Sequence, residues 1–234
     1  MKDLLLNSIN YLLKPLTNNF FEELSKNSKV NQLIKLYPND KFIKIRFWDA
    51  PYLEVETIIS KNSSIIDLGC GDGFFANFLA ISSKKRKVFG IEINKSRIIS
   101  ADKGLQNTRF LSGDITKTKL PKTDVVVLFH VLHHLTSFKT QNKLLNVCSK
   151  QLKKNGKLII VEVEPKISYR YLIAWLVDHF LVPWIFDRKF YSPIYFRRGQ
   201  DWVTLLNQLA FKTKVTNLER DKPFSHVLIE ATKT

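Results

Sequence analysis

The feature that most constrains the fold is a glycine-rich turn between a predicted strand and a predicted helix, residues 65–75 (IIDLGCGDGFF). Gly69, Gly71 and Gly73 let the backbone turn sharply and let a ligand approach without a clash against a Cβ atom. The first amides of the following helix would point at that ligand, and the helix dipole favours negative charge there. The segment therefore predicts a ligand site where a strand of a parallel sheet ends.

From residue 63 onward, predicted strands and helices alternate. The expected strands are 63–68, 87–93, 108–115, 123–132, 157–165, 212–220 and 226–233, and the expected helices are 74–83, 95–105, 138–152 and 201–211. This order predicts an α/β fold, a Rossmann-like, mostly parallel seven-stranded sheet with helices on both faces. The last helix is followed by two strands, which predicts an antiparallel C-terminal hairpin at the sheet edge. The segment from Lys153 to Gly156 is expected to close the third helix as a turn.

The two remaining parts of the chain differ from this pattern. Residues 1–36 carry apolar positions at helical spacing, and 37–62 are looser, with Pro51 expected to open a short helix. Residues 166–198 are dense in aromatic side chains. We therefore expect an N-terminal helical segment (1–60) and one larger domain (61–234), with an aromatic lid insertion at 166–198.

Composition limits the classes of partner. The chain has 234 residues, 44% of them hydrophobic, which suffices for a hydrophobic core that needs no stabilising disulfides or metal ions. A formal net charge of +16 favours nucleic acid, an anionic membrane surface or acidic small molecules, although a lysine-biased composition is an equal explanation. Cys70 and Cys148 show neither a metal-binding nor a disulfide spacing, which fits a reducing compartment such as the cytoplasm. We expect a cytoplasmic location, with peripheral membrane association as a second expectation. No signal peptide or spanning helix is expected.

The register of the glycines separates two classes of ligand. A dinucleotide fingerprint is Gly-x-Gly-x-x-Gly, whereas this chain has Gly-x-Gly-x-Gly. Phe74 stands where the third glycine of the fingerprint would be. Asp67, at the strand end, is poorly placed beside a pyrophosphate and suits a ligand with an amino group. A nicotinamide oxidoreductase is therefore disfavoured.

The segment DLGCGDG resembles the first motif of class I S-adenosylmethionine-dependent methyltransferases. The resemblance spans about residues 60–165 and includes DVVVLFHVLHHL (124–135), similar to the fourth motif of the branch that methylates quinones and other small molecules. It implies that Glu92 binds the ribose hydroxyls, as a carboxylate accepting two hydrogen bonds can, and that Asp114 meets the adenine amino group. The cofactor-binding residues implied are Asp67, Gly69, Cys70, Gly71, Gly73, Glu92, Ile93, Asp114, Ile115 and His130.

The acceptor side is expected near three histidines after the fourth strand. His130, His133 and His134 are catalytic candidates, because histidine has a suitable pKa for a base, although they equally fit a structural role in the turn. No metal is expected, since nearby carboxylates and cysteines complete no ligand set. The substrate candidates are Arg46, Trp175, Asp178, His179 and Tyr195, of which Arg46 is expected to close over the cofactor carboxylate.

The predicted function is S-adenosylmethionine-dependent methylation of a hydrophobic or aromatic small molecule or lipid-like acceptor, because an aromatic lid suits a flat or greasy molecule. An RNA or protein methyltransferase is the alternative that the basic charge supports. The sequence lacks the Asn/Asp-Pro-Pro-aromatic motif of nucleobase methylation, and no RNA-binding module is visible, so nucleic acid is the less favoured partner. A non-catalytic cofactor-binding protein is the third alternative.

Overall fold

The computed structural model describes residues 20–38, 43–166, 169–176, 179–180, 193–218 and 225–234. They contain a seven-stranded sheet with the order β3-β2-β1-β4-β5-β7-β6. The strands are β1 (Ser64–Leu68), β2 (Lys87–Glu92), β3 (Thr108–Ser112), β4 (Thr123–Phe129), β5 (Leu152–Val163), β6 (Phe211–Leu218) and β7 (His226–Lys233). The first five pair in parallel, whereas β7 is antiparallel to both β5 and β6. The predicted parallel sheet and antiparallel hairpin are confirmed.

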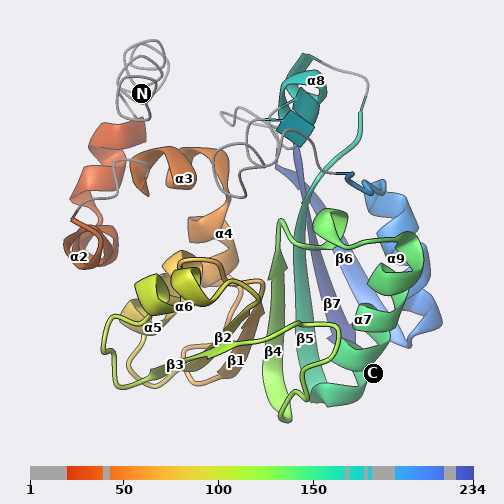
Figure 1. Cartoon of the computed structure of the whole chain (residues 1–234), viewed down its shortest axis with the longest axis horizontal. Helices are drawn as coiled ribbons and strands as arrows, with labels where there is room; N and C mark the ends of the chain where they lie inside the picture. Colours follow the sequence, from red (N-terminus) through yellow and green to blue (C-terminus); the bar gives the residue numbers. More distant parts are fainter. Residues whose placement is uncertain (1–19, 39–42, 167–168, 177–178, 181–192, 219–224) are drawn as a thin grey trace.

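Helices cover both faces of this sheet (Figure 1). They are α2 (Ser28–Leu36), α3 (Ile43–Asp49), α4 (Tyr52–Thr57), α5 (Phe74–Ser82), α6 (Lys95–Ala101), α7 (Phe138–Gln151), α8 (Tyr169–Leu176) and α9 (Gly199–Gln208), with a 3₁₀ turn η1 (Leu132–His134). Residues 20–26 are also helical. Pro51 precedes α4 directly, as expected of a residue that favours the start of a helix. None of the helices in the described ranges combines the length and apolar character needed to cross a bilayer.

One predicted turn is wrong. The segment from Lys153 to Gly156 belongs to β5, which begins at Leu152 directly after α7. The pairing of β4 with β5 is irregular there, since the register shifts between Thr123 and Val125. Asn155 has a φ of +59°, so turn-like residues are accommodated inside the strand as an irregularity.

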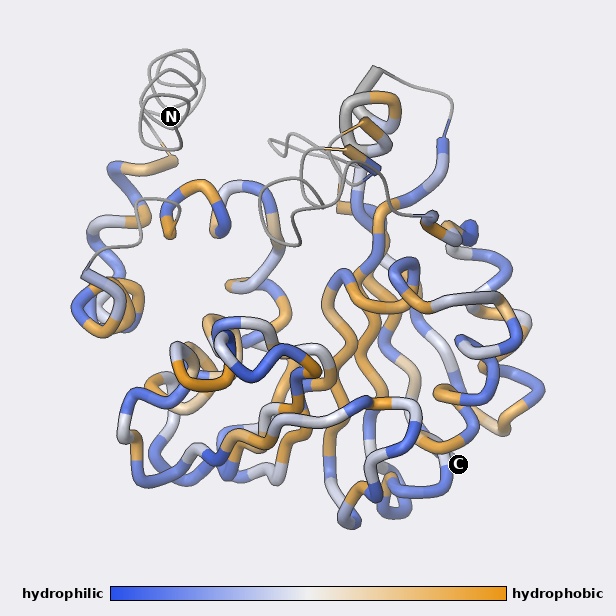
Figure 2. Tube along the Cα trace, viewed as in Figure 1, coloured by the Kyte–Doolittle hydropathy of each residue, from blue (hydrophilic) through white to orange (hydrophobic). Residues whose placement is uncertain are grey.

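Two apolar clusters lie on opposite faces of the sheet, and the central strands are the most apolar part of the trace (Figure 2). One face packs α2, α3, α4 and α5 against β1 and β4, and the other packs α7 and α9 against the same strands. The first cluster joins Leu33 and Phe47 to Phe78, so residues on both sides of position 60 share one core. The division of the chain at that position stays a prediction.

The topology fixes where a ligand site can lie. Strand β1 pairs with β2 on one side and β4 on the other, so the chain reverses its order across the sheet at β1. Crevices for ligands form outside the carboxyl ends of the strands at such a point. Figure 1 shows α8 beyond the end of the sheet to which the arrowhead of β4 points.

Candidate active site

The glycine turn has the backbone geometry that its sequence predicts. Gly69, Gly71 and Gly73 have φ values of +75°, +55° and +68°, in the region that favours glycine. A Cβ on Gly69 would lie 2.6 Å from Cγ2 of Val131, and a Cβ on Gly73 would lie 2.6 Å from Cβ of Ala101. Neighbouring side chains therefore pack directly against Gly69 and Gly73, and only glycine fits at these two positions.

Asp67 is the buried acid of this turn. Asp67 is 2% exposed and lies in β1, which pairs with β2 on one side and with β4 on the other. Burial, with a smaller contribution from the neighbouring Glu92 carboxylate, raises the pKa of Asp67 to about 7. Such a carboxyl gains a favourable partner when a cationic group binds beside it.

Glu92 ends β2 and is held by backbone amides on both sides. The amide of Gly71 donates to Oε2 at 3.1 Å, and the amide of Asn94 donates to Oε1 at 3.0 Å. A carboxylate can accept about four hydrogen bonds, so both oxygens keep further acceptor capacity. Glu92 is thus oriented by the glycine turn and remains able to accept from paired hydroxyl groups.

The end of β3 carries the third acid. Asp114 Oδ1 accepts hydrogen bonds from the amide and hydroxyl of Thr116, and these bonds hold the pKa of Asp114 below its usual value. Ile115 beside it is buried, whereas Ile93 after β2 is 69% exposed. An exposed apolar side chain next to Glu92 suits contact with a flat ring.

Two arginines form ion pairs with Asp72, in the middle of the glycine turn. The guanidinium Nη2 of Arg97 lies 3.3 Å from Asp72 Oδ2, and that of Arg46 lies 3.8 Å from the same oxygen. Tyr37 donates from its hydroxyl to the carbonyl of Asp72 at 2.8 Å. The ion pair of Arg46 joins α3 to the turn, and closure of Arg46 over the cofactor carboxylate stays a prediction.

His130 follows β4 in a strained conformation. Its φ is +54°, uncommon for a residue with a side chain. Burial lowers the pKa of His130 well below its usual range, and the nearby His226 lowers it further. The two imidazoles stack, with ring centroids 4.7 Å apart and planes 14° apart.

His133 is oriented by Glu162, the penultimate residue of β5. The Glu162 Oε1 atom accepts the amides of Val131 and Leu132 at 3.1 and 2.8 Å, and Oε2 contacts His133 Nδ1. A carboxylate accepts hydrogen bonds, so Nδ1 is the ring nitrogen that donates to Glu162. His134, next in sequence, is exposed.

The aromatic segment reaches the same turn. The amide of Tyr195 donates to the carbonyl of His133 at 2.9 Å, and Phe196 stacks on the His133 ring at 5.0 Å. The ring centroids of Trp175 and His179 are 4.4 Å apart, and those of His179 and Phe196 are 6.4 Å apart. Asp178 lies outside the described residues.

The expected cofactor residues share one end of the sheet, since they follow β1, β2, β3 and β4 at their carboxyl ends. The sequence from residue 59 to 181 matches the family model described as a methyltransferase domain, which is more than half of the chain. This chain belongs to the methyltransferase domain family.

Relatives of this methyltransferase domain are distant. The demethylmenaquinone methyltransferase of Thermotoga maritima is 26% identical over 137 residues, which are 56% of this chain and 57% of that protein. Indole glucosinolate O-methyltransferase 5 of Arabidopsis thaliana is 30% identical over 99 residues, which are 42% of this chain and 26% of that protein. A methyltransferase of Bacillus cytotoxicus is 29% identical over 117 residues, covering 48% of this chain and 54% of that protein. The chain thus spans less than two thirds of these relatives.

Solved structures share the fold of this methyltransferase. A SAM-dependent methyltransferase from Aquifex aeolicus gives a TM-score of 0.61 at 17% identity, covering 88% of this chain and 98% of that one. Magnesium protoporphyrin IX methyltransferase of Synechocystis PCC 6803, with bound SAH, gives 0.62 at 15% identity, covering 93% and 100%. The Rossmann-like methyltransferase fold is confirmed.

Several residues of this methyltransferase site have no signal in the sequence alone. The sequence pattern predicted Glu162 only as a residue of a strand, and Asp72 only as a residue of the glycine-rich turn. Asp49 and His226 come from α3 and β7, yet a ligand atom from each lies within 4.8 Å of one from His130. Their meeting depends on the order of strands and could not be found by spacing along the chain.

Proposed function

We propose that this chain is an S-adenosylmethionine-dependent methyltransferase that acts on a hydrophobic or aromatic small molecule or a lipid-like acceptor. The observation that carries the proposal is the buried Asp67 carboxyl beside three positive-φ glycines, with Glu92 and Asp114 at the ends of the next two strands. This donor and acceptor set fits one ligand with an amino group, a ribose and an adenine ring. The relatives that methylate quinones and small aromatic molecules support the same class of acceptor.

S-adenosylmethionine supplies a methyl group on a sulfonium, which is already activated for transfer to a nucleophile. The protein therefore mainly binds and aligns. Asp67 would bind the amino group, and Glu92 would accept from the ribose hydroxyls with the lone pairs that its backbone bonds leave. Asp114 and the exposed Ile93 would bind the adenine ring.

We propose His133 as the base for an acceptor that must lose a proton. Glu162 fixes Nδ1 as the protonated nitrogen, so Nε2 is the atom that can take the acceptor proton. Tyr195 and Phe196 cover this histidine and would hold a flat acceptor against it. Glu162 is a positioning residue, because it acts through the imidazole.

Kinetics can separate these two roles. With a quinone-like acceptor, His133→Ala should lower kcat by about 100-fold or more with KM within a few-fold, the range expected for a general base. Glu162→Gln should give a smaller loss of kcat, and Lys139→Ala, at an exposed position of α7, should stay near wild type. An unchanged kcat in His133→Ala would contradict the assignment.

Calorimetry tests the cofactor before any acceptor is known. We expect S-adenosylmethionine and S-adenosylhomocysteine to bind, NAD not to bind, and Glu92→Ala to lose the binding. Glu54→Ala is the matched control, because Glu54 is an exposed acid on α4. Binding of NAD, or of none of the three ligands, would overturn the proposal.

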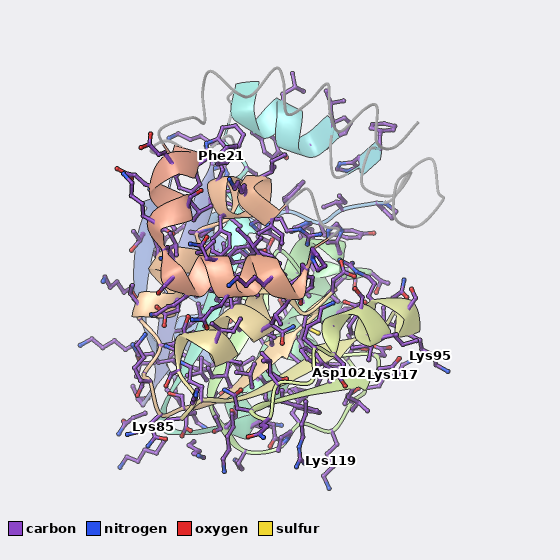
Figure 3. The ribbon with its side chains drawn as sticks, turned by 90° about the vertical axis from the view of Figure 1, so that its left-hand side faces the viewer. Phe21, Lys85, Lys95, Asp102, Lys117 and Lys119 are labelled. Atoms are coloured by element: carbon purple, nitrogen blue, oxygen red, sulfur yellow. The ribbon has the colours of Figure 1, made fainter. Side chains whose placement is uncertain are left out.

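A cytoplasmic location with contact to an anionic membrane surface is a further part of the proposal. Leu172 and Leu176 lie one helical turn apart on α8 and are 57% and 47% exposed. The net charge of +16 attracts anionic lipid, whereas the labelled lysines Lys85, Lys95, Lys117 and Lys119 extend outward from the part of the domain that lies away from α8 (Figure 3). Co-sedimentation with anionic vesicles but not neutral ones is expected, and Leu172→Ser with Leu176→Ser should weaken it.

The alternative of an RNA substrate has one supporting observation, the same basic charge. Steeply salt-dependent RNA binding together with methyl transfer to RNA would favour it over a small molecule.

A further inference from the structure

Three residues far apart in the sequence meet beside the end of β4. Asp49 ends α3, His130 follows β4, and His226 begins β7. One potential ligand atom from each lies within 4.8 Å of the others, and His226 Nε2 is 3.7 Å from Asp49 Oδ1. At that separation the carboxylate and the imidazole face each other.

The cluster is largely removed from solvent. His226 is fully buried, and the side chain of Asp49 is 27% exposed. Within the described part of the chain, the Nε2 atom of His130 is buried and has no hydrogen-bond partner. An unmet buried polar atom costs free energy, and a bound ion would remove that cost at this position.

The backbone conformation of His130 points the same way. A positive φ in a histidine is a local strain, and such strain persists only where the surrounding structure imposes it. Here the amide of His130 donates to the carbonyl of Val161 at 2.9 Å, which ties the strained residue to β5. The ring is thereby held against His226, whose register on β7 is fixed by pairing with Val163.

We propose that Asp49, His130 and His226 form a binding site for a divalent transition-metal ion of the Zn²⁺ class. Two imidazoles and one carboxylate are a ligand set that such ions prefer, and three protein ligands leave a coordination position open. Metal–ligand bonds of about 2.0–2.2 Å place tetrahedral ligand atoms about 3.4 Å apart. Atoms that lie within 4.8 Å of one another must therefore approach by at most about 1.4 Å, which side-chain rotation can supply.

The position of the site gives the ion a role that rests on the proposed function. His130 follows the strand whose end lies at the topological switch, where the methyl acceptor is proposed to bind. A divalent ion with an open position binds oxygen and sulfur anions and favours their ionised form. The acceptor class that this site would select is therefore a small molecule with an ionisable hydroxyl or thiol.

Metal titration of the untagged full chain tests the proposal without any acceptor. After treatment with EDTA and gel filtration, CoCl₂ should produce visible d–d absorption that saturates at one ion per chain, and ZnCl₂ should displace it. His226→Gln, His130→Gln and Asp49→Asn should each weaken Zn²⁺ binding by about 10-fold or more, because each removes a direct ligand. His134→Gln is the matched control, since it removes an exposed histidine four residues from His130, and it should bind as wild type.

Two further measurements keep the result unambiguous. Thermal unfolding and S-adenosylhomocysteine binding of each variant show that it is folded, and Asp49→Asn, an isosteric change at a partly exposed residue, serves if His226→Gln does not fold. Absence of a stoichiometric site in wild type, or equal binding in the three ligand variants and wild type, would overturn the metal site. If S-adenosylhomocysteine binds while the metal does not, the metal site fails and the proposed function stands.

Discussion

At the scale of single residues, Asp67 makes cofactor binding depend on pH. Its pKa of about 7 means that the carboxyl is protonated in the free protein below that pH, because burial and then Glu92 disfavour the charge. Binding of a cationic amino group requires the ionised form. The effect of Asp67 on the affinity for S-adenosylmethionine should therefore level off about one unit above pH 7, and the affinity should fall below pH 7, approaching tenfold per pH unit.

Calorimetry between pH 5.5 and 7.5 checks this prediction. Asp67→Asn should bind weakly and show little change of affinity over the same range, because the titrating group is gone. An affinity of the wild-type protein that is flat from pH 5.5 to 7.5 would show that Asp67 does not ionise on binding.

Gly73 is a second residue with a sharp expectation. Gly73→Ala should destabilise the fold by several kcal/mol, since its Cβ would lie 2.6 Å from Cβ of Ala101 and 3.0 Å from Cα of that residue. Gly104 has nearly the same φ, +69°, but nothing within 4 Å of an added Cβ. Gly104→Ala should cost only the backbone strain, about 1–2 kcal/mol. Urea unfolding of both variants separates packing from strain, and equal losses would contradict the packing argument.

At the scale of elements, Arg86 connects α4 to α5 through its buried guanidinium. It donates to the Glu56 carboxylate at 2.8 Å, to the Ile59 carbonyl at 2.5 Å and to the Leu79 carbonyl at 3.3 Å. The bond to Ile59 satisfies a carbonyl just beyond the end of α4, and the bond to Leu79 reaches a carbonyl within α5.

Arg86→Met should therefore lower the free energy of unfolding by about 3–5 kcal/mol, because it leaves the mostly buried Glu56 carboxylate with fewer partners. Lys85→Met, at the exposed neighbouring position, is the control and should change it by less than about 0.5 kcal/mol. Denaturant unfolding measures both, and a loss in Arg86→Met no larger than the control would show that α4 is held by apolar packing alone.

At the scale of the whole molecule, the sheet order predicts where the fold opens first. Strands β1, β4 and β5 are central and buried along most of their length, whereas β3 and β6 form the two edges and alternate between buried and exposed positions. Amide exchange should be slowest in the central strands and fastest at the edges, because an edge strand has one unpaired side. Exchange measured by mass spectrometry checks this, and β6 as protected as β4 would contradict it.

The sequence determined the parts of this protein that depend on short-range physics. The spacing of apolar residues located the strands, and the glycines at 69, 71 and 73 located the turn, because backbone preference and periodicity act within a few residues. Glu92 and Asp114 were predicted from the resemblance to class I methyltransferases, and the structure places Glu92 at the end of β2 and Asp114 two residues after β3. Lys153–Gly156 lies inside β5 rather than closing the third helix, although none of these four residues pairs with β4, whose partners pass from Leu152 directly to Lys157.

Only the tertiary structure decided which side chains meet across elements. His133 and Glu162 lie 29 positions apart, and Asp49, His130 and His226 come from α3, β4 and β7. Such contacts follow from the sheet order and from the insertion of β7 between β5 and β6, and neither is encoded in any local window of the sequence. The physical reason is that burial and pairing act between distant segments, so a local pattern specifies each element and the packing of all of them specifies the site.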